Sequence, residues 1–94
     1  FILLDFTAEW CVACKEMEMT TFKDENVQKE LSGWILAKVD CTISTLENTK
    51  IIEKYNIKGF PGFAIVAPDG KIKGSFTGYY PPQQFLEKIR QLKK

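Results

Sequence analysis

The chain has 94 residues, of which 45% are hydrophobic and 27% are charged, and its formal net charge is +1. This length and composition suit one small globular domain with a packed core. A charge so near neutral gives no electrostatic reason to expect nucleic acid or an anionic membrane surface as a partner. No apolar run approaches the roughly 20 residues that a membrane-spanning helix needs.

The chain opens with a run of strand length that is followed by a helix. Residues 1–7 are almost all apolar, as in a parallel strand covered on both faces, so we expect a strand there. The residues from Cys11 to Thr20 or Thr21 are mostly good helix formers without Gly or Pro, which predicts a helix. Cys11 and Cys14 therefore lie where a buried strand ends and a helix begins.

This position favours redox chemistry at the cysteine pair. A thiol at the start of a helix meets unpaired backbone N–H groups and the positive end of the helix dipole, which favour the thiolate. Cys11 and Cys14 lie on one side of the first turn and can close a small disulfide ring. Such a pair exchanges two electrons, because one thiolate attacks a partner disulfide and the second resolves the mixed disulfide.

Two other roles for the pair are less favoured. Zinc needs four ligands, but the chain has no His and only one further cysteine, Cys41, so we expect no metal site. A purely structural disulfide across so short a loop removes little entropy from the unfolded chain. Cys41 ends a later strand, out of reach of the pair, and we expect it to be a reduced and inert thiol.

Two acidic residues are candidates for proton transfer. Asp5 lies inside the apolar strand, where a carboxylate is costly unless it is paired, hydrated or neutral. It is either a strand-end acid that reaches water, or a carboxyl group of raised pKa that moves the proton of Cys14. Glu18 follows Cys14 by four residues on the same helix side, where it takes part in proton transfer or raises the thiol pKa. A solvated helix acid is the open alternative for Glu18.

Three more helices are expected after the first. Asp24 predicts the N-cap of a short helix that ends near Leu31. Ser44 and Glu47 have the spacing of a capping box, with Ser44 at the N-cap of a helix that ends near residue 56. A last helix begins at residues 81–82, where two prolines suit a helix start. The apolar residues of the third helix should turn inward together with one threonine: Leu46, Thr49, Ile51, Ile52 and Tyr55.

Three more strands complete the expected sheet. Apolar runs predict strands at residues 34–41, 62–67 and 71–77, and the turn at 68–71 joins the last two as an antiparallel hairpin. The helices between the first two strands make those strands parallel. The order predicts one domain, residues 1–94, with an α/β fold in which a four-stranded mixed sheet carries helices on both faces.

Two segments resemble a known family. The run from Asp5 to Lys15 resembles the active-site segment of the thioredoxin superfamily, and Gly59-Phe60-Pro61 resembles its cis-proline loop. Val12 and Ala13 depart from ordinary thioredoxins, in which Gly-Pro is expected. The run Cys-Val-Ala-Cys-Lys-Glu, followed by Glu18, is instead similar to the C-terminal periplasmic domain of membrane reductases of the DsbD family.

The resemblance implies the thioredoxin fold, with a further strand and helix before residue 1, so we expect the chain to be a piece of a longer protein. Asp5 matches the buried acid of the family, and Lys38 matches a lysine near that acid, which predicts a Lys38–Asp5 interaction. Pro61 and the backbone of Phe60 would hold an extended partner segment as an added strand. Trp10 and Phe60 would form the apolar rim of this docking surface, with core packing as the alternative for each.

These observations favour a protein-disulfide reductase that works by thiol–disulfide exchange and needs no cofactor. Cys11 would attack the partner, Cys14 would resolve, and Asp5 with Glu18 would handle the proton. Residues 12 and 13 add no positive charge, whereas Asp5, Glu9 and Glu18 add negative charge that raises the thiol pKa and favours a reductant.

The resemblance also implies partners and a location. We expect a monomeric domain tethered to the bacterial inner membrane, which takes electrons from a membrane-embedded donor and passes them to disulfides of periplasmic proteins. Two alternatives stay open: a stand-alone thioredoxin-like reductase, and a thioredoxin-fold binding module with little turnover.

Overall fold

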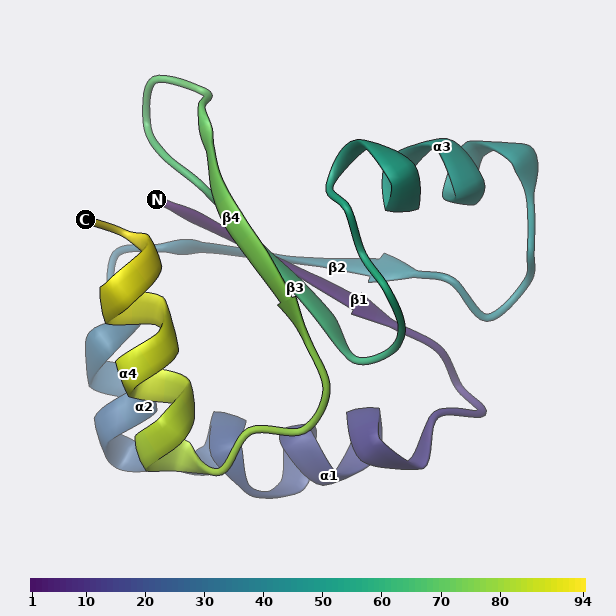
Figure 1. The fold of residues 1–94 in the computed structure, drawn as a ribbon. Coiled ribbons are helices and arrows are strands. Elements are labelled where there is room, and N and C mark those ends of the chain that lie inside the picture. Colours follow the sequence, from purple (N-terminus) through teal and green to yellow (C-terminus); the bar gives the residue numbers. More distant parts are fainter.

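The computed structural model describes all of residues 1–94, and its helices and strands alternate along the chain (Figure 1). The strands are β1 (Ile2–Thr7), β2 (Ile35–Asp40), β3 (Gly62–Val66) and β4 (Ile72–Thr77). The helices are α1 (Val12–Met19), the 3₁₀ turn η1 (Thr21–Lys23), α2 (Glu25–Glu30), α3 (Leu46–Lys54) and α4 (Pro82–Leu92). Each expected element is present, and none of the helices is long and apolar enough to cross a membrane.

The four strands form one mixed sheet in the order β2-β1-β3-β4. β1 and β2 are parallel, whereas β3 is antiparallel to both β1 and β4. The helical segment between β1 and β2 supplies the crossover that two parallel neighbours require. The register places Asp5 of β1 between Lys38 of β2 and Phe63 of β3. The acid of this central strand therefore has a lysine beside it on the edge strand.

Helices cover both faces of the sheet (Figure 1): α3 lies on one side, and α1, α2 and α4 lie on the other. Side chains alternate between the faces along a strand. Leu3 and Asp5 of β1 accordingly face α1 and α2, whereas Leu4 and Phe6 face α3. This two-sided arrangement confirms the fold class expected from the sequence.

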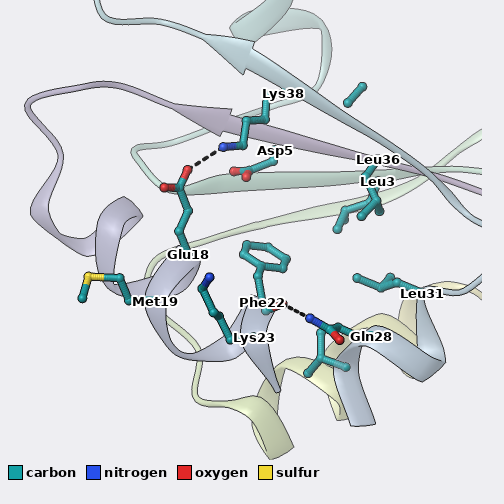
Figure 2. Close-up of a pocket in the computed structure, with 12 residues that line it drawn as sticks. Leu3, Asp5, Glu18, Met19, Phe22, Lys23, Gln28, Leu31, Leu36 and Lys38 are labelled. Carbon is teal, nitrogen blue, oxygen red and sulfur yellow. Dashed lines mark hydrogen bonds and ion pairs between the residues drawn. The ribbon is translucent and has the colours of Figure 1, made fainter. Parts of the chain in front are cut away.

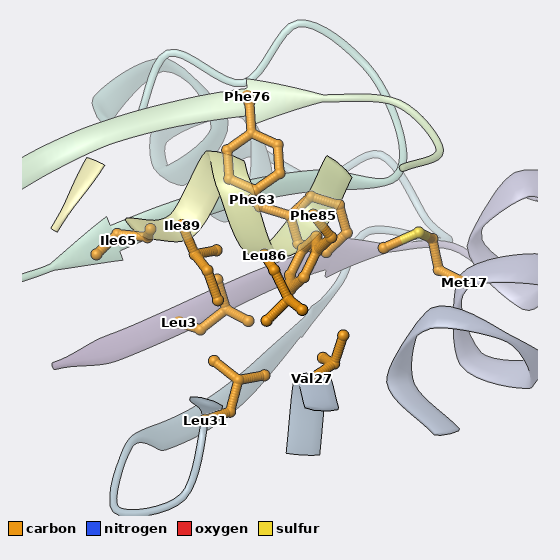
Figure 3. Close-up of a cluster of buried hydrophobic side chains, with 10 residues drawn as sticks. All are labelled: Leu3, Met17, Val27, Leu31, Phe63, Ile65, Phe76, Phe85, Leu86 and Ile89. Atoms are coloured by element: carbon orange, nitrogen blue, oxygen red, sulfur yellow. The ribbon is translucent and has the colours of Figure 1, made fainter. Parts of the chain in front are cut away.

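The main core lies between the sheet and α1, α2 and α4 (Figure 3). Phe63, Phe76 and Phe85 form its centre, with ring centroids 5.1, 5.4 and 5.8 Å apart. Two of these three pairs meet at steep angles, near the edge-to-face geometry that aromatic rings prefer. All five residues of β3 are buried, because β1 and β4 flank this strand and helices cover both of its faces. β3 is therefore the element around which both cores assemble.

The start of α3 corrects one expectation. Thr45, not Ser44, is the N-cap, and its Oγ1 accepts a hydrogen bond of 3.1 Å from the backbone N–H of Asn48. The helix therefore begins one residue later than the capping-box spacing predicts. Leu46 and Thr49 are exposed, contrary to expectation, because at 100° per residue they lie outside the helix face that Ile51, Ile52 and Tyr55 share and pack on the sheet.

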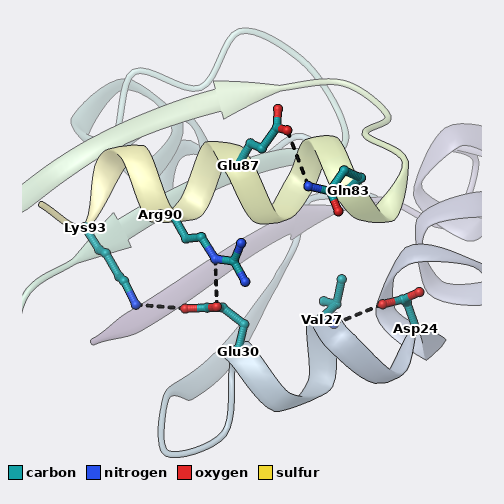
Figure 4. Close-up of polar contacts among 7 residues, drawn as sticks. All are labelled: Asp24, Val27, Glu30, Gln83, Glu87, Arg90 and Lys93. Carbon is teal, nitrogen blue, oxygen red and sulfur yellow. Dashed lines mark hydrogen bonds and ion pairs between the residues drawn. The ribbon is translucent and has the colours of Figure 1, made fainter.

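Polar contacts join α2 to α4 on the outside of the main core (Figure 4). The carboxylate of Glu30 accepts hydrogen bonds from Arg90 Nε at 2.9 Å and from Lys93 Nζ at 2.8 Å. At the other end of α2, the N-cap Asp24 accepts from the backbone N–H of Val27. These contacts join α2 to α4, and η1 contacts both of these helices as well as α1.

Candidate active site

The two cysteines lie at the junction between β1 and α1 and form a disulfide with each other. Their Cα atoms are 5.3 Å apart, within the range that a disulfide allows. Cys11 is the N-cap of α1, one position before the helix start, and its Sγ accepts a hydrogen bond of 3.1 Å from the backbone N–H of Cys14. The helix start thus directs an N–H group at the first sulfur, which favours negative charge there.

Both cysteines are nearly covered. Cys11 is 7% exposed and Cys14 is 4% exposed, and together with Ala8 they form a small apolar cluster against which Phe60 packs. The first cysteine is the more exposed of the two, although the difference is small. Cys11 therefore meets solvent only over a small area, and a reaction partner must approach it closely.

Asp5 lies on the face of the sheet that α1 covers (Figure 2). Burial raises the pKa of its carboxyl group from 3.8 to about 6, while the charge of Lys38 lowers this pKa and the charge of Glu18 raises it. Burial and the raised pKa argue against a strand-end acid that reaches water, and the role of Asp5 toward the proton of Cys14 stays a prediction. At neutral pH the group is mostly ionised, but it takes up a proton more readily than an ordinary aspartate does.

Glu18 and Lys38 form an ion pair between α1 and β2 beside Asp5 (Figure 2). Lys38 Nζ donates to Glu18 Oε1 at 2.6 Å, and this bond is the main reason that the pKa of Lys38 is raised. The expected Lys38–Asp5 interaction is present as an interaction between charges and not as a hydrogen bond. The two residues lie side by side in the register of the sheet, but Lys38 acts on Asp5 through its charge and gives its hydrogen bond to Glu18.

Of the three residues expected to form the docking surface, Phe60 packs against the two cysteines, and Trp10 contacts Phe60. Trp10 is 62% exposed, and its ring meets the ring of Phe60 nearly edge-on, with centroids 5.6 Å apart. The Phe60–Pro61 peptide bond is cis, as the family resemblance implied. Pro61 is fully buried, and its carbonyl accepts a hydrogen bond of 2.8 Å from the backbone N–H of Gly78. Trp10 therefore does not belong to the core, whereas Phe60 packs partly into it.

Thr42 is a residue of the site that the sequence did not single out. Its Oγ1 accepts a 2.9 Å hydrogen bond from the backbone N–H of Glu9, and its carbonyl accepts a 3.1 Å bond from Trp10 Nε1. Asp40 accepts hydrogen bonds from both the backbone N–H and the hydroxyl group of Thr42. Only the pairing of β1 with β2 brings these loops together, so no local spacing in the sequence could have indicated this contact.

The third cysteine lies apart from the pair. Cys41 is free and buried among the apolar residues under α3, as predicted. Burial raises the pKa of its thiol, and the negative charge of Asp40 raises it further. No group of three or more His, Cys, Asp or Glu side chains is placed to hold a metal ion.

Comparison with known proteins supports this description. Residues 1–93 match the family described as the thioredoxin-like domain. The thiol:disulfide interchange protein DsbD of Actinobacillus pleuropneumoniae is 36% identical over 93 residues, which are 97% of this chain and 16% of that protein. DsbD of Yersinia pestis is 34% identical over 91 residues, which are 95% of this chain and 15% of that protein. The chain thus spans about a sixth of the length of these relatives.

Solved structures agree with the fold and the family. The oxidised C-terminal domain of Neisseria meningitidis DsbD superposes with a TM-score of 0.80 at 29% identity, over 96% of this chain and 78% of that one. A thioredoxin from Thermus thermophilus superposes with a TM-score of 0.77 at 26% identity, over 97% of this chain and 72% of that one. By its sequence and its fold, the chain belongs to the thioredoxin-like family, and it is similar along nearly its whole length to the C-terminal domain of DsbD.

Proposed function

We propose that this domain reduces disulfide bonds in other proteins by dithiol–disulfide exchange. The observation that carries the proposal is the Cys11–Cys14 disulfide at the start of α1, where the helix directs a backbone N–H group at the first sulfur. A disulfide that closes between the first turn of a helix and its cap is well placed to open and close, because it holds no distant parts of the chain together. The partly buried acid with a pKa of about 6 adds a proton acceptor on the same side of the sheet.

The first step is attack by the reduced domain. The thiolate of Cys11 forms a bond to one sulfur of the partner disulfide, and the other partner sulfur leaves as a thiolate that takes up a proton. The start of α1 stabilises the attacking thiolate through its N–H groups and dipole. The product is a mixed disulfide between Cys11 and the partner.

The second step releases the partner. Cys14 gives its proton to the carboxylate of Asp5, which is mostly ionised at neutral pH. The Cys14 thiolate then attacks the sulfur of Cys11, the bond from Cys11 to the partner breaks, and the second partner sulfur leaves as a thiolate. Two electrons have moved to the partner, and the Cys11–Cys14 disulfide has formed. Asp5 acts in this step as a general base, with Glu18 adjusting its charge environment.

Trp10, Phe60 and Pro61 supply the docking surface in this proposal. The exposed indole and the ring of Phe60 offer apolar area around a sulfur that is otherwise nearly covered. An extended partner segment next to Pro61 would bring its disulfide to Cys11.

The direction of electron flow follows from the charges. Asp5, Glu9 and Glu18 place negative charge in the segments that carry the pair, and negative surroundings disfavour the thiolate form of a reduced dithiol, which favours a reductant. We propose that the domain is re-reduced by a membrane-embedded dithiol donor and serves disulfides in the bacterial periplasm. The likeness to DsbD, a protein about six times the length of this chain, supports this placement.

Reduction of insulin by the chain tests the proposal, with dithiothreitol as the electron source. Cys11→Ser should abolish turnover. The reduced Cys14→Ser variant, mixed with insulin after dithiothreitol is removed, should accumulate a mixed disulfide that mass spectrometry detects. Cys41→Ser is the matched control and should keep the parent rate, because Cys41 lies in a separate cluster. Turnover by Cys11→Ser would overturn the assignment of the attacking sulfur. A parent chain that binds insulin without reducing it would instead identify a binding module.

A further inference from the structure

The loop between β4 and α4 runs past the end of α1 (Figure 1). Its residues 78–80 are called the Tyr79 loop below. Gly78, the first of them, donates its backbone N–H to the carbonyl of Pro61 at 2.8 Å. The residue before Pro61, Phe60, packs against the two cysteines. The Tyr79 loop is therefore joined directly to the cis-proline segment of the proposed docking surface.

Three further hydrogen bonds join the Tyr79 loop to α1 and η1. Thr21 Oγ1 donates to the carbonyl of Tyr80 at 2.6 Å, and the backbone N–H of Tyr80 donates to Met17 Sδ at 3.4 Å. The hydroxyl oxygens of Tyr79 and Thr20 lie 3.1 Å apart. Thr21 is fully buried, so no water competes for its bond to Tyr80. The loop is thus held in place between the cis-proline and the helix that carries the cysteines.

The hydroxyl group of Tyr79 is already used inside the chain. Thr20 has a single hydroxyl hydrogen, which it donates to the carbonyl of Glu16 at 2.7 Å. Tyr79 is therefore the donor in its hydrogen bond with Thr20. Tyr79 is 39% exposed, and it can offer a partner its apolar ring but no hydrogen-bond donor.

The sequence around Tyr79 is uncharged. No Asp, Glu, Lys or Arg occurs between Lys73 and Glu87, although 27% of the chain is charged. Pro81 and Pro82 follow the loop and restrict its backbone. An aromatic ring that is fixed in this way loses little conformational entropy when a partner packs against it, and such rings often dominate binding energy. The surroundings therefore suit an apolar contact better than a charged one.

Tyr79 lies within reach of a segment that binds beside Pro61. Its Cα atom is no more than about 8 Å from the carbonyl oxygen of Pro61, because only Gly78 separates the two. An extended chain advances about 3.3 Å per residue. In a partner segment beside Pro61, a residue about two or three positions from the attacked cysteine can therefore meet the ring of Tyr79.

We propose that the Tyr79 loop is a second wall of the docking surface, and that Tyr79 selects partners with a large apolar side chain about two or three residues from the attacked cysteine. The inference rests on the proposed function and names its class of substrate. Trp10 is bonded to the loop after β2, at one edge of the sheet, whereas Tyr79 follows β4, at the other edge. A partner segment beside Pro61 thus lies between two aromatic side chains.

Peptide probes of known sequence test this preference. Each probe has a central cysteine that forms a mixed disulfide with nitrothiobenzoate, in a background of glycine and serine. One series carries a single leucine at each of the three positions on either side of the cysteine, and matched series carry serine or lysine there. Cys11 of the reduced chain forms a bond to the peptide sulfur, and nitrothiobenzoate, the better leaving group, departs as a coloured thiolate. Stopped-flow absorbance at increasing peptide concentration separates binding from the chemical step.

The parent should attack the best leucine probe roughly five- to tenfold more efficiently than the matching serine probe, through tighter binding. Tyr79→Ser should remove this preference, whereas Tyr79→Phe, which keeps the ring, should retain most of it. Tyr79→Glu should instead prefer the lysine probe at the same position, a reversal that a merely structural role would not produce. Ile72→Ser is the matched control, because Ile72 is 44% exposed at the other end of β4.

Two further measurements keep the test specific. Dithiobis-nitrobenzoate has no peptide segment, so the parent and every variant should attack it at the same rate. Tyr79→Thr replaces Tyr79→Ser if circular dichroism shows that the serine variant is unfolded. A parent chain that leaves insulin intact would overturn the proposed function. A parent that reduces insulin but prefers leucine at no position, or a folded Tyr79→Ser variant that keeps the preference, would overturn the role of Tyr79 alone.

Discussion

Asp5 is the single residue whose surroundings most change its chemistry. Its carboxyl group lies on a central strand between Lys38 and Phe63, and burial raises its pKa to about 6. A raised carboxyl pKa means that the folded state holds the proton more tightly than the unfolded chain does. The group that would serve the resolving step therefore weakens the fold at neutral pH.

Asp5→Asn should stabilise the chain at about pH 7 by roughly 1–3 kcal/mol, because the amide carries no charge to desolvate. The carboxyl group of Asp5 has a pKa of 3.8 in the unfolded chain and of about 6 in the folded chain. The stability of the parent should accordingly fall relative to that of Asp5→Asn as the pH rises through this window, and the two should converge below it. Urea unfolding at several pH values measures the difference. A constant difference across the window would show that Asp5 is not desolvated.

Single residues also show what the sequence could predict at the site. The dithiol, the anomalous acid and the cis-proline follow from composition, spacing and family likeness along the chain. The hydrogen-bond partner of Lys38 could not be predicted from the sequence. Lys38 donates to Glu18 and not to Asp5, and this depends on how far α1 lies from β2. The role of Thr42 could not be predicted for the same reason, because its hydrogen bond with Trp10 joins residues 32 positions apart in the sequence.

Among the elements, α2 and α4 depend on each other through one carboxylate. Glu30 accepts hydrogen bonds from Arg90 and Lys93, and these bonds lower the pKa of its carboxyl group below 4.5. The Glu30 side chain is largely covered, although both cations are more exposed. This contact is thus better placed than an isolated surface pair to hold two helices together.

Glu30→Gln should lower the free energy of unfolding by about 1 kcal/mol at neutral pH, a value kept small by the exposure of the cations. The ion pairs of Glu30 stabilise the folded chain above pH 4.5, which is the ordinary pKa of the group. This stabilisation is lost as the pH falls through the lowered pKa of Glu30. Thermal unfolding at neutral and acidic pH measures it. Glu87→Gln is the control, because Glu87 contacts only Gln83 of its own helix. Equal losses in both variants would contradict a specific role for Glu30.

Elements were easier to predict than their ends. Strong apolar periodicity and turn residues placed all four strands, because these signals are local. The start of α3 was missed because Ser44 and Thr45 are both good caps, and the choice between them depends on how the helix packs. Leu46 was expected to turn inward although it lies on the helix face opposite to Tyr55, and it is exposed.

Across the whole molecule, the protection of backbone amides from hydrogen exchange should depend on the position of each strand in the sheet. β3 is flanked on both sides and entirely buried, whereas β2 is an edge strand whose outer side has no neighbour. The backbone N–H groups at the two ends of β2 point toward β1, because Ile35 donates to the carbonyl of Phe1 and Cys41 to that of Thr7. Alternation therefore directs the N–H groups of Leu36, Lys38 and Asp40 outward.

Amide hydrogen exchange measured by NMR should reflect this asymmetry. Amides of β3 should exchange only through global unfolding, and those of Leu36, Lys38 and Asp40 should exchange orders of magnitude faster. The amides of Ile35 and Cys41, on the inner side of the same strand, are the internal reference. Slow exchange at all five positions would mean that the outer edge of β2 is paired in solution.

The hydrogen bonds of Thr42 matter for anyone who transplants this site. Residues 8–15 carry both thiols, but the acceptor for the Trp10 indole and the anchor for the Glu9 backbone come from the loop after β2. A graft of that short peptide onto another scaffold would transfer the reactive sulfurs and leave the indole unanchored. The smallest portable unit is therefore discontinuous, and it includes the loop at residues 40–42 as well as the cysteine segment.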